Sequence, residues 1–197
     1  MSKAEITKAY IIEKSAPIFN TKGFAGTSLN DITEATGLTK GAIYGNFEDK
    51  NEIALAVYNY NVANMKRRMN EAIDSKELGY DKLFAYTDYY RRTWEKVFER
   101  GGCPVLNASV EADDNLPFLK RSVQNTIKGW IKSISDIIEL GKEQNQIRKD
   151  INSAKYATTI ITLIEGGIMM AKINNNHEPL FNALDRIETI IKTELKK

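Results

Sequence analysis

Four polar residues between positions 39 and 46 could contact nucleic-acid phosphates and base edges. They are Thr39, Lys40, Tyr44 and Asn46. Side chains of these types donate hydrogen bonds to phosphate oxygens, and some of them also reach base edges. Two small residues, Gly41 and Ala42, would let a helix carrying these groups approach another surface closely. A helix of nine residues is about 13 Å long at about 1.5 Å per residue, which suits a major groove about 12 Å wide.

A short helical unit must position these residues. Ser28 can cap a first helix by accepting a bond from a backbone N–H, and Asp31 favours the same N-terminus by its charge. Gly37 can take the left-handed conformation that ends a helix. Thr39 then caps a second helix that we expect to reach about Asn46. Two short helices joined by a glycine-containing turn form the helix-turn-helix pattern.

The spacing alone leaves two interpretations open. Ile43 and Phe47 lie four residues apart and can face a core, so the polar side chains face outward. The outward face could bind DNA. Alternatively, the segment is a capped helical hairpin whose glycines serve close packing and whose polar face is only solvated.

A resemblance to the TetR family of transcriptional regulators is carried by the run GFAGTSLNDITEATGLTKGAIYGNFEDKNEIALAV. It covers about the first 55 residues and is specific in residue type and in spacing. The matching residues are Gly23, Phe24, Thr27, Ser28, Asp31, Ile32, Gly37, Leu38, Thr39, Lys40, Gly41, Ile43, Tyr44, Phe47 and Lys50.

This resemblance implies two sets of DNA contacts. The residues matching the usual phosphate contacts of the family are Thr27, Ser28, Tyr44, Asn46 and Lys50. Those lying along the recognition helix, where they can approach bases, are Thr39, Lys40, Gly41 and Ala42. Asn46 stands where many members carry histidine. Because its amide can still donate to a phosphate, we expect a changed contact at this position.

Helical periodicity extends over the rest of the chain, and no segment has the alternation of a strand. The expected fold is all-α, with a helix-turn-helix DNA-binding domain at residues 1–50 and a helical ligand-binding and dimerisation domain at 51–197. Pro17 should kink or divide the first helix. A turn is expected at 113–115. The expected helices are 3–22, 49–75, 80–99, 104–112, 116–145, 153–173 and 178–195.

Aromatic residues in the larger domain could line a cavity for a small molecule. Pockets for such ligands are mostly apolar, with a few polar groups that fix orientation. Most of these aromatics should form ordinary core. The residues we expect at the pocket wall are Tyr89, Trp94, Phe98, Asn107 and Trp130.

Helices 153–173 and 178–195 are predicted to form a homodimer interface. The first is apolar on more than one face, so another helix layer must cover it, and Gly166 and Gly167 would let helices approach closely. Members of the TetR family pair through a four-helix bundle of this kind. Alternatively, the two helices simply close a monomer core. Charged residues interrupt helix 153–173, which argues against a membrane span.

The charge balance gives little support to nucleic-acid binding. The whole chain carries a net charge of +2, and residues 1–50 hold six lysines against six acidic residues. A positive face must therefore come from arrangement, and non-specific affinity should be modest. This balance keeps an alternative open, namely a helical ligand-binding or interaction protein that has lost DNA binding.

Catalysis is not expected, because the sequence shows no nucleophile–base pair, phosphate loop or metal cluster. The single cysteine, Cys103, and the single histidine, His177, cannot make a disulfide within the chain or a zinc cluster. We expect Cys103 to be a small buried residue. No cofactor is expected, and the N-terminus lacks the pattern of a signal peptide, so a cytoplasmic location fits.

Together with the resemblance, these features imply a ligand-responsive repressor. A two-fold dimer would present two recognition helices to a near-palindromic operator. A small-molecule effector would favour a state that no longer matches the two half-sites.

Overall fold

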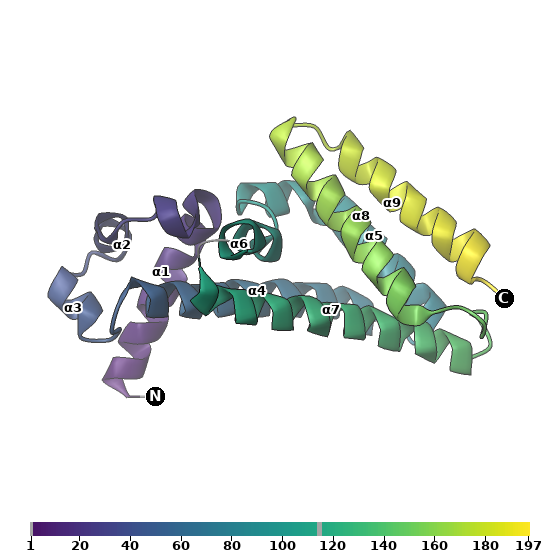
Figure 1. The fold of residues 1–197 in the computed structure, drawn as a ribbon, viewed down its shortest axis with the longest axis horizontal. Helices are drawn as coiled ribbons and strands as arrows, with labels where there is room; N and C mark the ends of the chain where they lie inside the picture. The colour runs from purple at the N-terminus through teal and green to yellow at the C-terminus, as the bar shows by residue number, and fades with distance from the viewer. Residues whose placement is uncertain (1, 114–115) are drawn as a thin grey trace. The chain divides into compact units, whose positions relative to one another are not determined.

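The computed structural model describes residues 2–113 and 116–197 (Figure 1). The described chain is helical and contains no strand, which confirms the all-α prediction. The turn predicted at 113–115 falls mostly outside the described residues. The helices are α1 (Lys3–Gly26), α2 (Leu29–Thr36), α3 (Lys40–Tyr44), α4 (Lys50–Asp74), α5 (Gly79–Glu99), α6 (Pro104–Ala112), α7 (Pro117–Glu143), α8 (Ser153–Ile173) and α9 (Glu178–Ile190), which continues into a π-helical turn, η1 (Ile191–Leu195).

The chain divides into two compact units. The first comprises Met1–Met65 and Arg100–Gln124, and the second comprises Lys66–Glu99 and Asn125–Lys197. Helices α4 and α7 each contribute one end to the first unit and the other end to the second. The functional boundary expected after residue 50 stays a prediction.

Helix α1 is divided at Gly23 and not at Pro17. The backbone of Gly23 is non-helical, with φ of +74° and ψ of 176°, while the residues around Pro17 keep helical geometry. A φ in this range strains any residue with a side chain, so glycine is required there. Ser2 begins the helix with a capping box in which its hydroxyl accepts the Glu5 N–H at 3.2 Å.

The core of the first unit is built from residues of α1, α2, α3 and the start of α4. Its fully buried side chains include Ile11 of α1, Ile32 of α2, Ile43 of α3 and Ile53 of α4. Phe47, in the turn before α4, is buried with them. This small core fixes the relative positions of α2 and α3.

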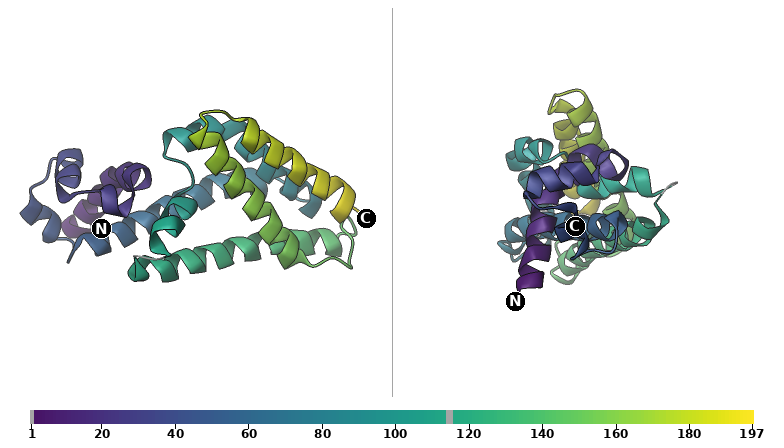
Figure 2. Two further views of the ribbon diagram at one scale, coloured as in Figure 1. Left: turned by 45° about the horizontal axis from the view of Figure 1, so that its top comes forward. Right: turned by 90° about the vertical axis from the view of Figure 1, so that its left-hand side faces the viewer.

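In the second unit, α8 and α9 lie side by side (Figures 1 and 2). Gly167 permits their close approach, because a Cβ atom there would lie 3.0 Å from the Ala183 Cβ and 3.1 Å from the Leu180 Cα. Gly166 has no atom within 4 Å of such a position. Gly167 is therefore packed against α9, whereas Gly166 faces open space.

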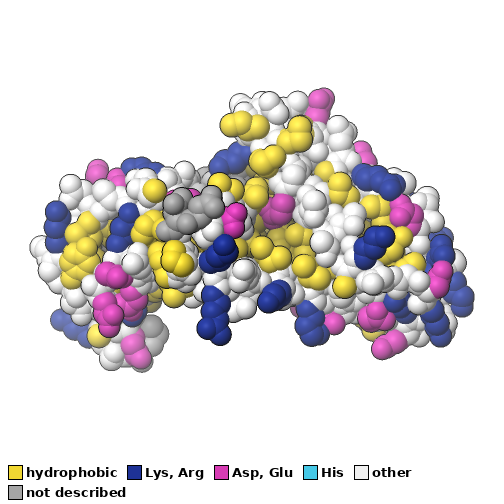
Figure 3. Space-filling view, viewed as in Figure 1, with side chains coloured by type: hydrophobic (Ala, Val, Ile, Leu, Met, Phe, Trp, Pro, Cys, Tyr) yellow, Lys and Arg dark blue, Asp and Glu magenta, His cyan; other side chains and the backbone are white. Residues whose placement is uncertain are grey.

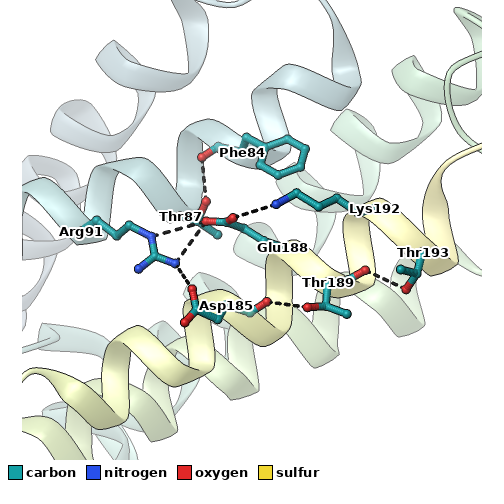
Figure 4. Close-up of polar contacts among 8 residues, drawn as sticks. All are labelled: Phe84, Thr87, Arg91, Asp185, Glu188, Thr189, Lys192 and Thr193. Carbon is teal, nitrogen blue, oxygen red and sulfur yellow. Dashed lines mark hydrogen bonds and ion pairs between the residues drawn. The ribbon is translucent and has the colours of Figure 1, made fainter.

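An ion-pair network joins α5 to α9 (Figure 4). The Arg91 guanidinium donates to the carboxylates of Asp185 and Glu188, the latter at 3.2 Å. Lys192 donates to the other oxygen of Glu188 at 3.2 Å. Its ammonium also lies 5.4 Å from the centre of the Phe84 ring. The network is partly shielded from water at Arg91 and Glu188, so it holds α9 in register against α5.

The end of the chain pairs with the bend after α7. Lys196 forms an isolated antiparallel bridge with Ile147. The N–H of Arg148 donates to the Leu195 carbonyl at 2.9 Å, and that of Lys197 donates to the Gln146 carbonyl at 3.0 Å. These bonds fasten the turn that follows α9.

Among the described residues one helix, α8, is both long enough and apolar enough to cross a membrane, judged by length and composition. Lys155, Glu165 and Lys172 interrupt it. It packs on α9, and 39% of its most apolar window is buried. Core helices of soluble proteins meet the same criterion, so this feature does not indicate a span.

Two glycines allow α5 and α7 to touch. A Cβ atom at Gly79 would lie 2.4 Å from the Gly141 N and 2.7 Å from the Ile137 carbonyl oxygen. Both neighbours are backbone atoms, which cannot give way as a flexible side chain can. We therefore expect Gly79→Ala to destabilise the protein by about 1–3 kcal/mol, the usual cost of overpacking.

The measurement is urea unfolding followed by circular dichroism. Gly129→Ala is the matched control, because Gly129 is exposed within α7 and only the Lys66 Nζ lies near it, at 3.9 Å. That variant should gain about 0.5–1 kcal/mol from helix propensity. Equal stability of Gly79→Ala and wild type would contradict the close contact.

Candidate nucleic-acid interface

The first helix of the helix-turn-helix begins and ends at the predicted residues, and the second begins at its predicted residue. The Ser28 hydroxyl accepts the Asp31 N–H at 3.2 Å, and the Asp31 carboxylate accepts the Ser28 N–H at 2.7 Å. Gly37 ends α2 in the left-handed conformation, with φ of +68°, and donates to the Thr33 carbonyl at 2.9 Å. The Thr39 hydroxyl accepts the Ala42 N–H at 3.2 Å and so begins α3. These caps satisfy N–H groups that have no acceptor inside a helix.

Helix α3 ends at Tyr44, two residues earlier than predicted. The Gly45 N–H donates to the Gly41 carbonyl, and the Asn46 side-chain amide donates to the Ala42 carbonyl at 2.9 Å. Asn46 thus helps to satisfy the end of its own helix. A side-chain amide carries two N–H groups, so one donor remains for a phosphate.

The outward face of α3 consists of residues predicted to reach DNA. Thr39, Lys40, Gly41 and Tyr44 are exposed, Tyr44 to 46%, and Ala42 is half-buried. Ile43 is fully buried in the core. The helix therefore has one buried side chain that faces the core, and its exposed face carries small residues and hydrogen-bond donors.

Three other predicted contacts have different surroundings. Ser28 is exposed, but its hydroxyl is engaged in the cap of α2. Thr27 is only 1% exposed, and its hydroxyl donates to the Gly23 carbonyl at 2.6 Å. The Lys50 ammonium donates to the Phe24 carbonyl at 2.6 Å and lies 4.3 Å from the centre of the Phe24 ring.

The surroundings of Lys50 change its acidity. Desolvation lowers the pKa of its ammonium, and the nearby carboxylates of Glu111 and Asp31 oppose that effect. In this structure the Thr27 hydroxyl and the Lys50 ammonium hold the backbone around residues 23–27. No sequence pattern indicates that Lys50 contacts Phe24, because the two residues lie 26 positions apart in the chain.

Two lysines of this region form ion pairs with acidic residues. Lys22 donates to Asp31 at 2.6 Å, and Lys8 donates to Glu52 at 2.6 Å. Among the described residues, Lys40 takes part in no ion pair. Because Lys40 is also exposed, its ammonium is available to a phosphate.

The aromatic residues predicted to line a ligand pocket lie in the second unit. Trp94 packs edge to face on Phe98, with ring centres 5.4 Å apart, and lies 5.2 Å from the His177 ring. Tyr89 is buried against Tyr90. All of these contacts are packing between side chains.

Trp130 is also buried, beside Tyr86. Burial raises the pKa of the Tyr86 hydroxyl, and the neighbouring side chains of Ser133 and Trp130 oppose that rise. The four predicted aromatic residues line neither of the two cavities described below, so their role in a ligand site stays a prediction.

Asn107 lies in the first unit. Its amide donates to the carbonyls of Asn20 and Gly101, each at 2.9 Å. It also lines a small cavity of about 40 Å³ between α1, α4, α6 and α7, which has room for a few water molecules only. Small-molecule pockets usually measure about 300–1,000 Å³.

An open groove in the second unit has a volume of about 400 Å³. Charged residues of both signs line it, among them Asp74, Lys82, Lys132 and Asp136. Lys132 pairs with Asp136 at 2.6 Å, and Lys82 lies 3.8 Å from Asp74. The local pairing leaves the groove without a surplus of either charge.

Cys103 is buried, as expected, with its Sγ 4.0 Å from the Met65 Sδ. No group of three or more metal-ligating side chains occurs in the part of the chain that the structure describes.

A capped pair of short helices that exposes a donor-rich second helix defines a DNA-binding protein of the helix-turn-helix class. Comparison with known proteins narrows the class. Residues 11–57 match the family described as "Bacterial regulatory proteins, tetR family", and residues 79–187 match "Tetracyclin repressor-like, C-terminal domain". The chain belongs to the TetR family of transcriptional regulators.

Solved structures and curated relatives agree with this assignment. A TetR-family regulator from Cytophaga hutchinsonii is 36% identical, with a TM-score of 0.95 and coverage of 100% of this chain and 98% of that one. One from Chloroflexus aurantiacus is 32% identical, with a TM-score of 0.91 and coverage of 100% and 99%. The transcriptional repressor NemR of Escherichia coli K12 is 26% identical over 95% of this chain and 94% of its own length.

The capping box of α2 leads to a prediction about pH. The Lys22 ammonium, followed by the N–H and hydroxyl of Ser28, holds the pKa of the Asp31 carboxyl well below its usual range. Stability from this carboxylate is therefore present above the pKa of an unfolded aspartate, about 3.9, and is lost as the pH falls toward the folded value. Asp31→Asn should lower the melting temperature at pH 7, and its difference from wild type should shrink by pH 3.

Thermal unfolding at constant ionic strength, followed by circular dichroism, measures this difference. Glu34→Gln on the exposed side of α2 supplies the general effect of removing one carboxylate. A difference between Asp31→Asn and wild type that stays constant from pH 7 to pH 3 would show that the charge of Asp31 does not stabilise the cap.

Proposed function

We propose that this regulator is a homodimeric repressor that binds a near-palindromic operator and is released from it by a small molecule. The observation that carries the proposal is the exposed face of α3, with Thr39, Lys40 and Tyr44 directed away from the core. Its relatives include proteins named as transcriptional repressors, DhaR and NemR. In this proposal residues 1–50 contact DNA and residues 51–197 bind the effector and the partner subunit.

The contacts proposed for α3 fall into two groups. Tyr44, Asn46 and Lys40 donate to phosphates, which sets the position of the protein on the duplex. Thr39, Lys40, Gly41 and Ala42 lie along α3, where they can approach base edges, and the small residues permit close contact. Thr27, Ser28 and Lys50 belong to the proposed interface too, through the backbone that they hold in place.

The proposed dimer interface is formed by residues 153–173 and 178–195. Met169, Met170 and Ile173 of α8 are large apolar residues that are exposed in the single chain, Ile173 to 82%. Figure 3 shows hydrophobic side chains at the surface over the end of α8 that leads to α9. An exposed apolar patch on a helix favours burial against another subunit, and the open position at Gly166 permits close approach.

The proposed effector is an aromatic or otherwise apolar molecule. This proposal is supported by the number of aromatic side chains on α5 and α7, among them Tyr89, Trp94, Phe98 and Trp130. Asn107 is engaged with backbone carbonyls, which makes it the weakest member of the predicted set. An effector acts by binding one conformation of the dimer more tightly than the other.

Substitution of the α3 donors should abolish specific binding. A titration with DNA flanking the gene of this protein should show salt-sensitive binding by wild type. Lys40→Ala should weaken that binding and lower the slope of log K against log salt by about 0.9, the value for one phosphate contact. Adding Tyr44→Ala should reduce the remaining affinity to that for random DNA.

Lys66→Ala is the matched control, because Lys66 is an exposed lysine of α4 outside the first unit. It should leave the affinity and the slope unchanged. Equal binding of wild type to flanking and random DNA would favour a helical ligand-binding protein that has lost DNA recognition. Repeating the titration with aromatic ligands tests release.

Charged substitutions on the exposed face of α8 should prevent pairing. Met169→Glu with Ile173→Glu would place two carboxylates in the proposed apolar interface, where unpaired charge is costly. Sedimentation equilibrium should report two chains per particle for wild type and one for the double variant. Ile6→Glu, at an exposed apolar residue of α1, should remain a dimer. A double variant that still pairs would place the interface elsewhere.

A further inference from the structure

A carboxylate of α6 holds the backbone at the end of α1. The Glu111 Oε1 accepts the Phe24 N–H at 2.8 Å, and the Oε2 accepts the Ala25 N–H at 3.0 Å. The two partners lie more than 80 residues before Glu111 in the chain. Both oxygens of one side chain are therefore used to bind adjacent backbone groups.

The local backbone explains why a carboxylate fits there. Gly23 interrupts α1, so the N–H groups that follow it begin a new helical turn without acceptors inside a helix. A negative charge at the start of a turn is also favoured by the backbone dipoles. A Cβ atom at Gly23 would lie 2.4 Å from the Glu111 Oε1, so glycine leaves the space that the carboxylate occupies.

The same short segment makes two further hydrogen bonds, one with α4 and one within itself. The Lys50 ammonium donates to the Phe24 carbonyl, and the Thr27 hydroxyl donates to the Gly23 carbonyl. Ser28, the cap of α2, follows directly. The segment 23–27 is thus tied to α4 and α6 and leads without a break into the helix-turn-helix.

Helix α6 contacts the end of α1 at a second point, one helical turn away. Asn107 donates to the Asn20 carbonyl, four residues before Glu111 on the same helix. The cavity of about 40 Å³ lies along this boundary, with Phe19, Ala108 and Glu111 in its wall. The boundary is therefore joined by specific hydrogen bonds, and its packing leaves a small cavity.

We propose that Glu111 is a positioning residue for DNA binding: by tying α6 to segment 23–27, it makes the placement of α2 and α3 depend on the placement of α6. The inference rests on the proposed DNA-binding function. Glu111 itself contacts no DNA in this scheme and acts through the backbone of Phe24 and Ala25.

Glu111→Gln separates this role from a simple charge effect. Removing a negative charge near a polyanion strengthens binding, whereas loss of the tie weakens it. We expect operator affinity to fall about tenfold, the scale of one lost hydrogen bond to a charged group. The salt slope should stay unchanged, because no phosphate contact is removed. Glu13→Gln, an exposed residue of α1, removes the same charge and should bind as tightly as wild type or more tightly.

Hydrogen exchange of the DNA-free protein provides an independent measurement. Peptides covering residues 20–36 should exchange faster in Glu111→Gln than in wild type or Glu13→Gln, and those covering α9 should not change. Gly23→Ala should give the same two effects, because its Cβ displaces the carboxylate. If Gly23→Ala does not fold, Glu111→Gln carries the test.

The outcomes are distinct. Faster exchange with weaker operator binding and an unchanged slope supports the proposal. Unchanged exchange overturns the tie, and faster exchange with unchanged affinity overturns its role in positioning. If wild type itself binds no DNA, the proposed function fails and the positioning role fails with it, while the exchange data still show whether Glu111 holds the segment.

Discussion

The DNA-binding unit depends on a small shared core, because α2 and α3 are too short to be stable alone. Helix α2 has eight residues and α3 has five, whereas isolated helices shorter than about 12–15 residues are marginal in water. Ile11, Ile32, Ile43 and Phe47 therefore stabilise the helices and orient them at once. A change in this core would alter the direction of α3 as well as the stability of the unit.

The polar groups at the helix ends follow from the same constraint. In a short helix a large share of the backbone N–H and C=O groups has no partner inside the helix, and nearby residues bind these groups at the ends of α2 and α3. Ser28 and Thr39 cap the starts of α2 and α3, and Gly37 and Asn46 satisfy their ends. At Gly23 no neighbouring residue provides the acceptor, and the side chain comes from α6.

Local patterns predicted the helices well and long-range contacts poorly. The caps at Ser28 and Thr39 and the end at Gly37 were predictable because each depends on residues within four positions. The Lys50 and Glu111 contacts were not, since they join residues 26 and 87 positions apart. The resemblance assigns Lys50 to a phosphate, and this contact stays a prediction; in the structure its ammonium donates to the Phe24 carbonyl.

The single buried residue of α3 has a consequence for how such regulators diversify. Because Ile43 alone anchors the helix, substitutions at its exposed positions change stability little, usually within about 0.5 kcal/mol. After gene duplication, one copy could acquire a new operator through changes along α3 while its core and its partner surface stay intact. The short recognition helix thus makes target choice evolvable separately from the fold.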